Sequence, residues 1–271
     1  MTVHITDYRE GFQSGFTQIT RFDDAEDNTG IAFGVLKLRS GDRHEVLTET
    51  ETAWLLMDGE VAVAIDDQVR APLSRHSLFD ESPSCVHVAK GARVVFDCRT
   101  DVEWTVYQTA NPKPFAPRVY RPADVPNEHR GKGQVGDACY RFVRTIFDRG
   151  RADSNAELVL GEVVTLPGRW SSYPPHHHDQ PEIYHYRFTQ PQGYGHAELG
   201  DAVLKVRQND TVKIFAPNDH AQCSAPGYGM YYAWAIRHLP DNPYGTPTFA
   251  AEHAWVMQPD ARFWQPKEST A

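Results

Sequence analysis

The chain has 271 residues, a formal net charge of −9 at pH 7 and 40% hydrophobic residues, and its length predicts one large domain or two of ordinary size. Because the chain is acidic and its basic residues are scattered, we expect neither nucleic acid nor an anionic membrane surface as a partner. No apolar run approaches the roughly 18 residues of a membrane span, and the first residues lack the basic and apolar segments of a secretory signal.

Four cysteines are present, and their spacing indicates free thiols. Cys85, Cys98, Cys139 and Cys223 lie far apart and form no C-x-x-C pair, so we expect neither a disulfide framework nor a zinc–thiolate site. Free thiols are typical of a reducing compartment, and a cytoplasmic location is therefore expected.

Short strands separated by turn residues dominate the first half of the chain. Residues 1–30 are polar and contain several glycines, which predicts irregular structure with an edge strand. Apolar runs then predict strands over residues 31–38, 52–57, 60–65, 85–88, 92–98 and 102–108. Asp58-Gly59 stands between two of these runs and predicts a tight hairpin turn.

A segment rich in proline, glycine and polar residues, residues 110–136, predicts the boundary between two modules, residues 1–120 and 121–271. Strands resume over residues 140–147, 157–165, 183–188, 202–206, 211–215 and 230–236. Many short strands with frequent turns and almost no helical period predict an all-β barrel or sandwich. We therefore expect two similar β modules in tandem, although no strict sequence repeat is visible.

The second module contains a motif with metal-ligand spacing: His176, His178 and Glu182. On an extended strand alternate side chains share a face, so His176 and His178 point the same way and His177 points the opposite way. After a short bend, Glu182 begins the return strand and brings a carboxylate to the same cavity. His220, at the end of a later strand and turn, is a fourth candidate. Imidazoles and a carboxylate that converge inside a barrel predict a site for a first-row transition metal.

A simpler interpretation is that the three consecutive histidines form an exposed polar turn. Two features argue against it. Pro174-Pro175 forces an extended approach to the motif, and apolar and aromatic residues resume directly after Glu182. The first module offers only His44 in its corresponding segment, so we expect that module to be structural and to contribute to packing and a dimer face.

Three runs of the second half carry a resemblance to a known family. They are Gly161-Glu162-Val163, Trp170-Ser171-Ser172-Tyr173-Pro174-Pro175-His176-x-His178-Asp179 and Glu182-Ile183-Tyr184-x-Tyr186-Arg187-Phe188. In these runs the chain resembles the cupin superfamily and, more narrowly, the 5-deoxy-glucuronate isomerases of inositol breakdown, relatives of the 4-deoxy-5-ketouronate isomerases. The similarity spans most of the second half and is faint in the first.

The resemblance implies a bicupin, that is, an all-β chain of two tandem cupin barrels, each a double-stranded β-helix or jelly roll. It also implies a divalent metal, usually zinc, and an aldose–ketose isomerisation of 5-deoxy-glucuronate to 5-dehydro-2-deoxy-gluconate. Carried over position by position, His176, His178, Glu182 and His220 resemble the metal ligands. Asp219 and residues 196–201 and 233–239 differ from the family pattern where substrate would be held, so an isomerase of a different sugar acid stays an alternative.

The expected chemistry assigns further roles. A divalent ion stabilises the negative charge that builds on oxygen when a carbonyl moves to the adjacent carbon. Four protein ligands would saturate tetrahedral zinc, which keeps Mn or Fe(II) as alternatives. Tyr184 and Tyr186 share a strand parity with Glu182 and are the catalytic candidates, unless they only fill the barrel interior. Lys213 and Arg237 are candidate partners for a substrate carboxylate.

Two other functions stay open. A cupin with the same ligands can be an Fe(II) dioxygenase, which a requirement for oxygen would reveal, and a non-catalytic sugar-binding protein is a third reading. For the isomerase we expect a small sugar acid as the substrate and a homo-oligomer, dimer or larger, as the assembly.

Overall fold

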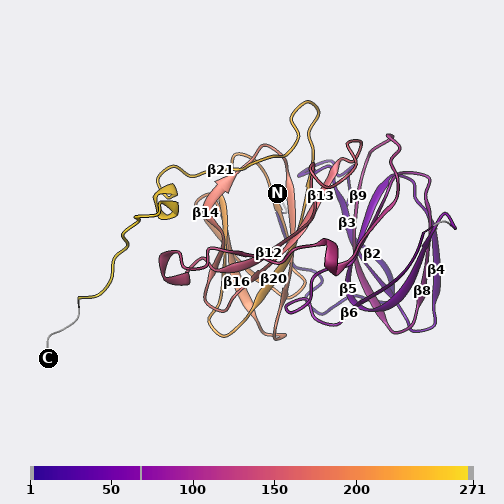
Figure 1. Cartoon of the computed structure of the whole chain (residues 1–271), viewed down its shortest axis with the longest axis horizontal. Coiled ribbons are helices and arrows are strands. Elements are labelled where there is room, and N and C mark those ends of the chain that lie inside the picture. Colours follow the sequence, from indigo (N-terminus) through magenta and orange to yellow (C-terminus); the bar gives the residue numbers. More distant parts are fainter. Residues whose placement is uncertain (1–2, 68, 268–271) are drawn as a thin grey trace.

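The structure is built almost wholly from β-strands arranged in three sheets (Figure 1). It is a computed structural model in which residues 3–67 and 69–267 are described. Within these ranges the helical elements are three short 3-10 helices, η1 (Pro122–Asp124), η2 (Val135–Asp137) and η3 (Ala254–Met257). None of the described helices has the length and apolar character needed to cross a membrane. The predicted all-β class is confirmed.

The first half of the chain forms a nine-stranded sheet whose apolar side chains enclose a core of their own. At its centre the ring of Phe96 lies 5.6 Å from that of Trp54 and 5.2 Å from that of Trp104. The strands are β2 (Gly15–Thr20), β3 (Ala32–Leu38), β4 (Arg43–Leu47), β5 (Glu51–Ile65), β6 (Val69–Arg75), β7 (Cys85–Val88), β8 (Arg93–Cys98), β9 (Val102–Thr109) and β10 (Arg118–Tyr120). Aromatic and aliphatic side chains fill this core.

β5 runs through Asp58-Gly59 without reversing, so the hairpin predicted there is wrong. The strand pairs with β9 as far as Leu56, shifts register, and pairs again at Asp58. Gly59 has a φ of 103°, and a Cβ at this position would lie 2.2 Å from the carbonyl oxygen of Asp101. The bulge therefore lies at Met57, between Leu56 and Asp58, and the positive φ of Gly59 just after it lets one long strand pass from β7 and β9 onto β6 and β8.

The second half consists of two sheets that share a core. The larger has seven strands in the order β1 (His4–Ile5), β18 (Thr211–Ile214), β15 (Glu182–Phe188), β20 (Met230–Arg237), β13 (Leu158–Thr165), β12 (Arg141–Phe147) and β11 (Glu128–Arg130). The smaller has the order β17 (Ala202–Arg207), β16 (Tyr194–Leu199), β19 (His220–Ser224), β14 (Trp170–His177) and β21 (Thr248–Phe249). Val143, Tyr186 and Tyr232 of the larger sheet lie in one core with Ala197 and Val206 of the smaller.

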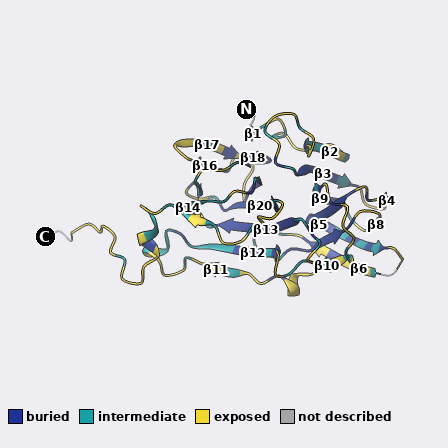
Figure 2. Ribbon diagram, turned by 90° about the horizontal axis from the view of Figure 1, so that it is seen from above, coloured by how far each residue is buried: buried dark blue, intermediate teal, exposed yellow. Residues whose placement is uncertain are grey.

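A further apolar core joins the two halves. Phe33, Leu55 and Tyr107 of the nine-stranded sheet and Ile183 and Tyr231 of the seven-stranded sheet belong to it, and all are fully buried. Because side chains alternate along a strand, the seven-stranded sheet presents one face to the first half and the other to its own core. In Figure 2 the buried strands β5, β9, β13 and β20 lie along this junction. The two halves therefore pack sheet against sheet.

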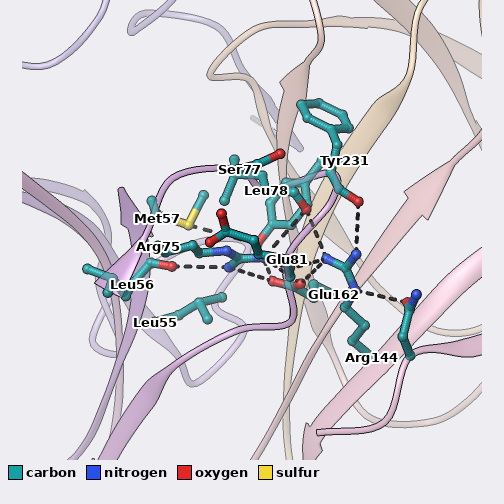
Figure 3. A network of polar contacts seen from close by, with 12 residues as sticks. Leu55, Leu56, Met57, Arg75, Ser77, Leu78, Glu81, Arg144, Glu162 and Tyr231 are labelled. Carbon is teal, nitrogen blue, oxygen red and sulfur yellow. Dashed lines mark hydrogen bonds and ion pairs between the residues drawn. The ribbon is translucent and has the colours of Figure 1, made fainter. Parts of the chain in front are cut away.

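An ion-pair cluster is buried within the junction (Figure 3). The carboxylate of Glu162 accepts hydrogen bonds from Arg75 at 2.7 Å, from Arg144 at 2.9 Å and from the hydroxyl of Tyr231 at 2.8 Å. Both guanidinium groups also donate to backbone carbonyl oxygens within residues 78–81. The charged groups are thus paired and hydrogen-bonded, which is what burial of charge requires, and they tie a loop of the first half to β12 and β13.

The first strand crosses from one half to the other. β1 pairs with β18, with His4 opposite Val212, and the Asp210 carboxylate contacts His4 at 2.7 Å and accepts a hydrogen bond from Arg9 at 2.6 Å. Strands β2 to β10 belong to the nine-stranded sheet, and strands from β11 onward belong to the other two sheets. The module boundary at residue 120 stays a prediction. Among the described strands, hydrogen-bonded pairing in each sheet ends at edge strands and does not return to the first strand. The sheets therefore do not close into the two barrels that the resemblance implied.

Candidate metal centre

Strand ends of the second half bring the predicted metal ligands to one place. His176 is the penultimate residue of β14, and His178 follows that strand directly. Glu182 begins β15, and His220 begins β19. The pairing of β14 with β19 sets His176 opposite His220, and Glu182 reaches the same point from the seven-stranded sheet. The site therefore lies between the two sheets of the second half.

Three of these side chains direct their ligand atoms toward one point. Nε2 of His178 lies 3.3 Å and Nε2 of His220 lies 3.4 Å from Oε2 of Glu182. Nδ1 of His178 faces the carbonyl oxygen of Gln180 at 2.7 Å, which orients the ring and leaves Nε2 for the site. Within the described ranges this is the one group of three His, Cys, Asp or Glu side chains whose ligand atoms lie within 4.8 Å of one another and could hold a metal ion.

The donor set fits a divalent transition-metal ion. Oε2 of Glu182 and both ring nitrogens of His220 are buried and make no hydrogen bond with any described residue. Buried polar atoms are normally satisfied by protein, water or an ion, so such a group calls for a partner. Imidazole nitrogens and a carboxylate are donors that zinc, manganese and iron(II) accept. A cation here would satisfy these otherwise unpaired atoms.

The surroundings of the cluster favour the ligating forms of Glu182 and His176. Burial acts to raise the pKa of Glu182, but the contacts with His178 and His220 outweigh it and lower that pKa to about 2. Burial, and then the neighbouring His220, lowers the pKa of His176 to about 4. Burial also acts to lower the pKa of His178, but Glu182 outweighs it and raises that pKa above its ordinary value. At neutral pH the carboxylate is therefore ionised and His176 is neutral, as metal ligation requires.

His176 stands beside the group of three. The centroid of its ring lies 4.4 Å from that of His220, and its Nδ1 faces the carbonyl oxygens of Ser172 and Pro174 at 3.2 and 3.3 Å. Its ligand atoms nevertheless fall outside that group. His177 points away, and its Nδ1 lies 2.7 Å from a carboxylate oxygen of Asp219. The structure thus brings three predicted ligands together and places the fourth against them.

The cluster opens on a cavity of about 350 Å³, a size that suits a small molecule. His176, His178 and Glu182 lie on its wall, and β12 and β13 supply a second wall. Residues 244–249 form the remaining side. Within that segment, the ring of Tyr244 lies 5.0 Å from that of His178 and the ring of Phe249 lies 5.8 Å from that of His176.

The two predicted catalytic tyrosines occupy different surroundings. Tyr184 lines the cavity, and its hydroxyl lies 3.4 Å from the hydroxyl of Ser172. Tyr186 does not line it, because its hydroxyl donates to Gln222 at 2.8 Å within the apolar core. Burial raises the pKa of both tyrosines well above the ordinary value. Tyr184 is therefore positioned as a hydrogen-bond donor to a ligand, whereas Tyr186 is a core residue.

Neither predicted carboxylate partner lines the cavity, so both assignments are corrected. Lys213 donates to the carbonyl oxygen of Asp27 at 3.1 Å. The guanidinium of Arg237 packs against Gly30, where a Cβ would lie 3.0 Å from its Nη1. Lys213 pairs with Ile183 on the neighbouring strand, and paired residues point to the same face of a sheet. Lys213 therefore faces the first half of the chain and not the cavity.

Two arginines that the sequence analysis missed do line the cavity, Arg130 on β11 and Arg141 on β12. Arg141 alternates with Val143 and Thr145, which also face the cavity, so a signal was present in the strand pattern. The sequence does not reveal which face of this strand meets the metal cluster, because that depends on distant pairing.

The chain has the fold of known cupin proteins. It superposes on an IolB-like protein from Salmonella typhimurium LT2 with a TM-score of 0.78 at 24% identity, over 90% of this chain and 96% of that one. A cupin 2 conserved barrel domain protein from Leptotrichia buccalis matches with a TM-score of 0.53 at 10% identity, over 87% of this chain and 96% of that one. Fold and site together define an all-β protein of the cupin type with a candidate metal centre.

The chain belongs to the KduI/IolB family, whose model matches residues 5–256. A relative from Geobacillus kaustophilus (strain HTA426), named 5-deoxy-glucuronate isomerase, is 28% identical over 255 residues, which cover 84% of this chain and 86% of that protein. The family resemblance seen in the sequence is therefore confirmed.

Proposed function

We propose that the chain is an aldose–ketose isomerase that converts 5-deoxy-glucuronate to 5-dehydro-2-deoxy-gluconate with the help of a divalent metal ion. The observation that carries the proposal is the convergence of His178, Glu182 and His220, the first two of which line a cavity sized for a small molecule. Membership of the KduI/IolB family and the name of the relative from Geobacillus supply the reaction and the substrate.

In the substrate's numbering, the reaction moves the hydrogen on C2 to the aldehyde carbon C1 and the hydroxyl proton on O2 to O1, so that C2 becomes the ketone and C1 the alcohol. His178, Glu182 and His220 would hold the metal ion, with His176 as the adjacent fourth candidate. When bound, the ion supplies a Lewis acid that stabilises negative charge on the substrate oxygens.

Other residues that line the cavity would bind the substrate, transfer the proton and exclude water. Tyr184, kept protonated by burial, donates a hydrogen bond to a substrate oxygen. Glu182 belongs to the cluster, so Asp148, the other carboxylate on the wall, carries the proton between C2 and C1. The rings of Tyr244 and Phe249 cover the histidines and exclude water from them.

The decisive experiment combines a turnover assay with elemental analysis of the purified protein. Wild type is expected to convert 5-deoxy-glucuronate without oxygen and to carry about one metal ion per chain. His178→Ala should lose both metal and activity. His177→Ala, a matched control whose parent side chain points away from the cluster, should retain both.

Equal metal content in the two variants would end the metal assignment. A requirement for oxygen would replace the isomerase with a dioxygenase. In deuterated water, solvent deuterium is expected at the hydroxymethyl carbon of the product, the former aldehyde carbon, unless the proton carrier is fully shielded from solvent.

Finer features of the proposal come from resemblance and composition. The architecture would be a bicupin built from modules 1–120 and 121–271, and the native metal would be zinc, with Mn or Fe(II) as alternatives. The protein would act in inositol catabolism in the cytoplasm and would form a homo-oligomer. Reconstitution with each metal tests the choice of metal, and analytical sedimentation tests the oligomeric state.

A further inference from the structure

We propose that Arg141 binds the carboxylate of the substrate, and that Val143 and Val163 beside it select the deoxygenated carbon next to that carboxylate. The inference rests on the proposed function for the identity of the sugar acid. The anion site itself rests on the geometry of the cavity wall.

Arg141 begins β12 and lines the cavity that contains the metal cluster. Its Nη1 donates to the carbonyl oxygen of Cys139 at 2.9 Å, and its Nε is buried without a hydrogen-bond partner among the described residues. A guanidinium carries five N–H donors, and no described residue accepts from Nη2. Nη2 and one N–H of Nη1 are therefore left for a ligand, and these two atoms form the fork that matches a carboxylate.

The fully buried arginines of the chain show what burial of a guanidinium group normally requires. In the part of the chain that the structure describes, the buried guanidinium groups have carboxylate partners: Arg75 and Arg144 pair with Glu162, and Arg187 pairs with Glu103. Arg141 is half-buried and, like Arg151, Arg169 and Arg237, has no such partner among the described residues, but of these four only Arg141 lines the cavity. A desolvated cation without an anion is unfavourable, so the missing anion is expected to come from outside the chain.

A second guanidinium strengthens the same wall. Arg130 on the neighbouring strand β11 also lines the cavity, and its guanidinium pairs with the carboxylate of Glu128 at 2.8 Å. Burial lowers the pKa of Arg141, and the nearby Arg130 acts in the same direction. An anion bound between the two would relieve both effects. Arg141 therefore gives the wall a positive charge without a described carboxylate partner in a chain whose net charge is −9, which favours binding of an acidic sugar.

The surface next to Arg141 is apolar. Val143 occupies the next position on the same face of β12, and it pairs directly with Val163 of β13. In 5-deoxy-glucuronate the carbon bonded to the carboxylate is a methylene, whereas in glucuronate it bears a hydroxyl. With the carboxylate at Arg141, this carbon lies against the valine pair. A hydroxyl there would lose its hydrogen bonds to water and gain none, so the deoxy sugar is preferred.

The anion site is tested by equilibrium binding of D-glucuronate and its uncharged analogue D-glucuronamide to the metal-containing protein. Wild type is expected to bind glucuronate at least about 10-fold more tightly than the amide. Arg141→Met should weaken glucuronate binding about 10- to 100-fold and bring the two ligands close to equal, as expected for the loss of charge-assisted hydrogen bonds. Arg149→Met removes the same charge from an exposed position and should leave the discrimination intact.

A folded Arg141→Met protein that still discriminates between the two ligands would overturn the assignment. Arg141→Lys keeps the positive charge but removes the two-pronged guanidinium group. This variant provides the test of the anion site if Arg141→Met does not fold. We expect glucuronate to bind it at least about 5-fold more weakly than wild type. Wild-type affinity in Arg141→Lys would equally overturn the assignment.

The valine pair is tested separately with Val143→Thr, which adds a hydroxyl at nearly constant volume. The preference for 5-deoxy-glucuronate over glucuronate, expressed as a ratio of kcat/KM or of affinity, should narrow about 3- to 10-fold. An unchanged ratio would remove this part of the inference.

These outcomes separate the inference from the proposed function. A wild-type protein that binds glucuronate through Arg141 but does not isomerise 5-deoxy-glucuronate would refute the function and keep the anion site. Isomerisation with an unchanged KM in Arg141→Met would keep the function and refute the site.

Discussion

Oε1 of Glu162 lies 2.7 Å from Nη2 of Arg75, and both side chains are fully buried where the two halves of the chain meet. Arg144 holds the same carboxylate from the second half, at 2.9 Å. Desolvation of three charged groups costs free energy that only close pairing and hydrogen bonding offset. The stability of the junction therefore depends on each member of the cluster.

Glu162→Gln removes the negative charge at constant shape and leaves two buried guanidinium groups unneutralised. We expect the free energy of unfolding to fall by about 3 to 5 kcal/mol, measured by urea denaturation. Asp97→Asn is the matched control, because Asp97 pairs with Arg43 in an exposed position, and it should cost less than about 1 kcal/mol. Equal losses of unfolding free energy in the two variants would show that the buried cluster contributes no more to stability than an exposed ion pair does.

The two tyrosines should separate activity from stability. Tyr184→Phe removes a hydroxyl from the cavity wall and should lower kcat about 10- to 100-fold with little loss of stability. Tyr186→Phe removes the hydrogen bond to Gln222 in the core, which should cost about 1 kcal/mol and leave kcat within a few-fold of wild type. Steady-state kinetics and thermal unfolding of both variants check the prediction, and a reversal of the two phenotypes would exchange their roles.

Asp148 should prove necessary for proton transfer but not for metal binding. We expect Asp148→Asn to lower kcat about 100-fold while the metal content stays at the wild-type value. Asp153→Asn serves as the control, since Asp153 is exposed and lies outside the cavity. Full activity of Asp148→Asn would assign the proton to another group.

The contact of the N-terminal segment with Asp210 should depend on pH. Burial opposes ionisation of Asp210, but hydrogen bonds from Arg9 and His4 outweigh burial and hold its pKa below the ordinary value of 3.8. A carboxyl whose pKa is lower in the folded state stabilises the fold above its unfolded pKa, and that stabilisation is lost as pH falls through the folded value.

We therefore expect wild type to exceed Asp210→Asn in the free energy of unfolding by about 1.5 to 3 kcal/mol above about pH 5. The difference should shrink as the pH is lowered below about 4. Denaturation curves over this range provide the measurement, and a gap that widened toward acid pH would contradict the sign. Asp23→Asn, at an exposed position, should show only a small gap throughout.

The strands that could be read from the sequence are those with strong apolar character. β3, β13, β15 and β20 have few exposed positions, and their apolar runs predicted them to within a residue or two. β4, β6 and β19 were missed because they are polar or interrupted, as at Pro72 in β6. Their pairing comes from distant strands and leaves no local pattern.

The candidate site divides in the same way. His176, His178 and Glu182 lie within seven residues of sequence, so strand alternation alone predicted their shared direction. Lys213 and Arg237 were assigned by charge alone, and the structure places both against the first half. Arg141 and Tyr244 enter the cavity only through the tertiary arrangement, which a single sequence does not encode in any local motif.

The pairing of β1 with β18 has a consequence for how the chain is made. His4 and Asp210, which contact each other, are 206 positions apart. A ribosome releases the chain from its N-terminal end, so the first strand leaves the exit tunnel long before its companion exists. The nine-stranded sheet can assemble during that interval, whereas β1 stays unpaired until β18, at residues 211–214, has been translated.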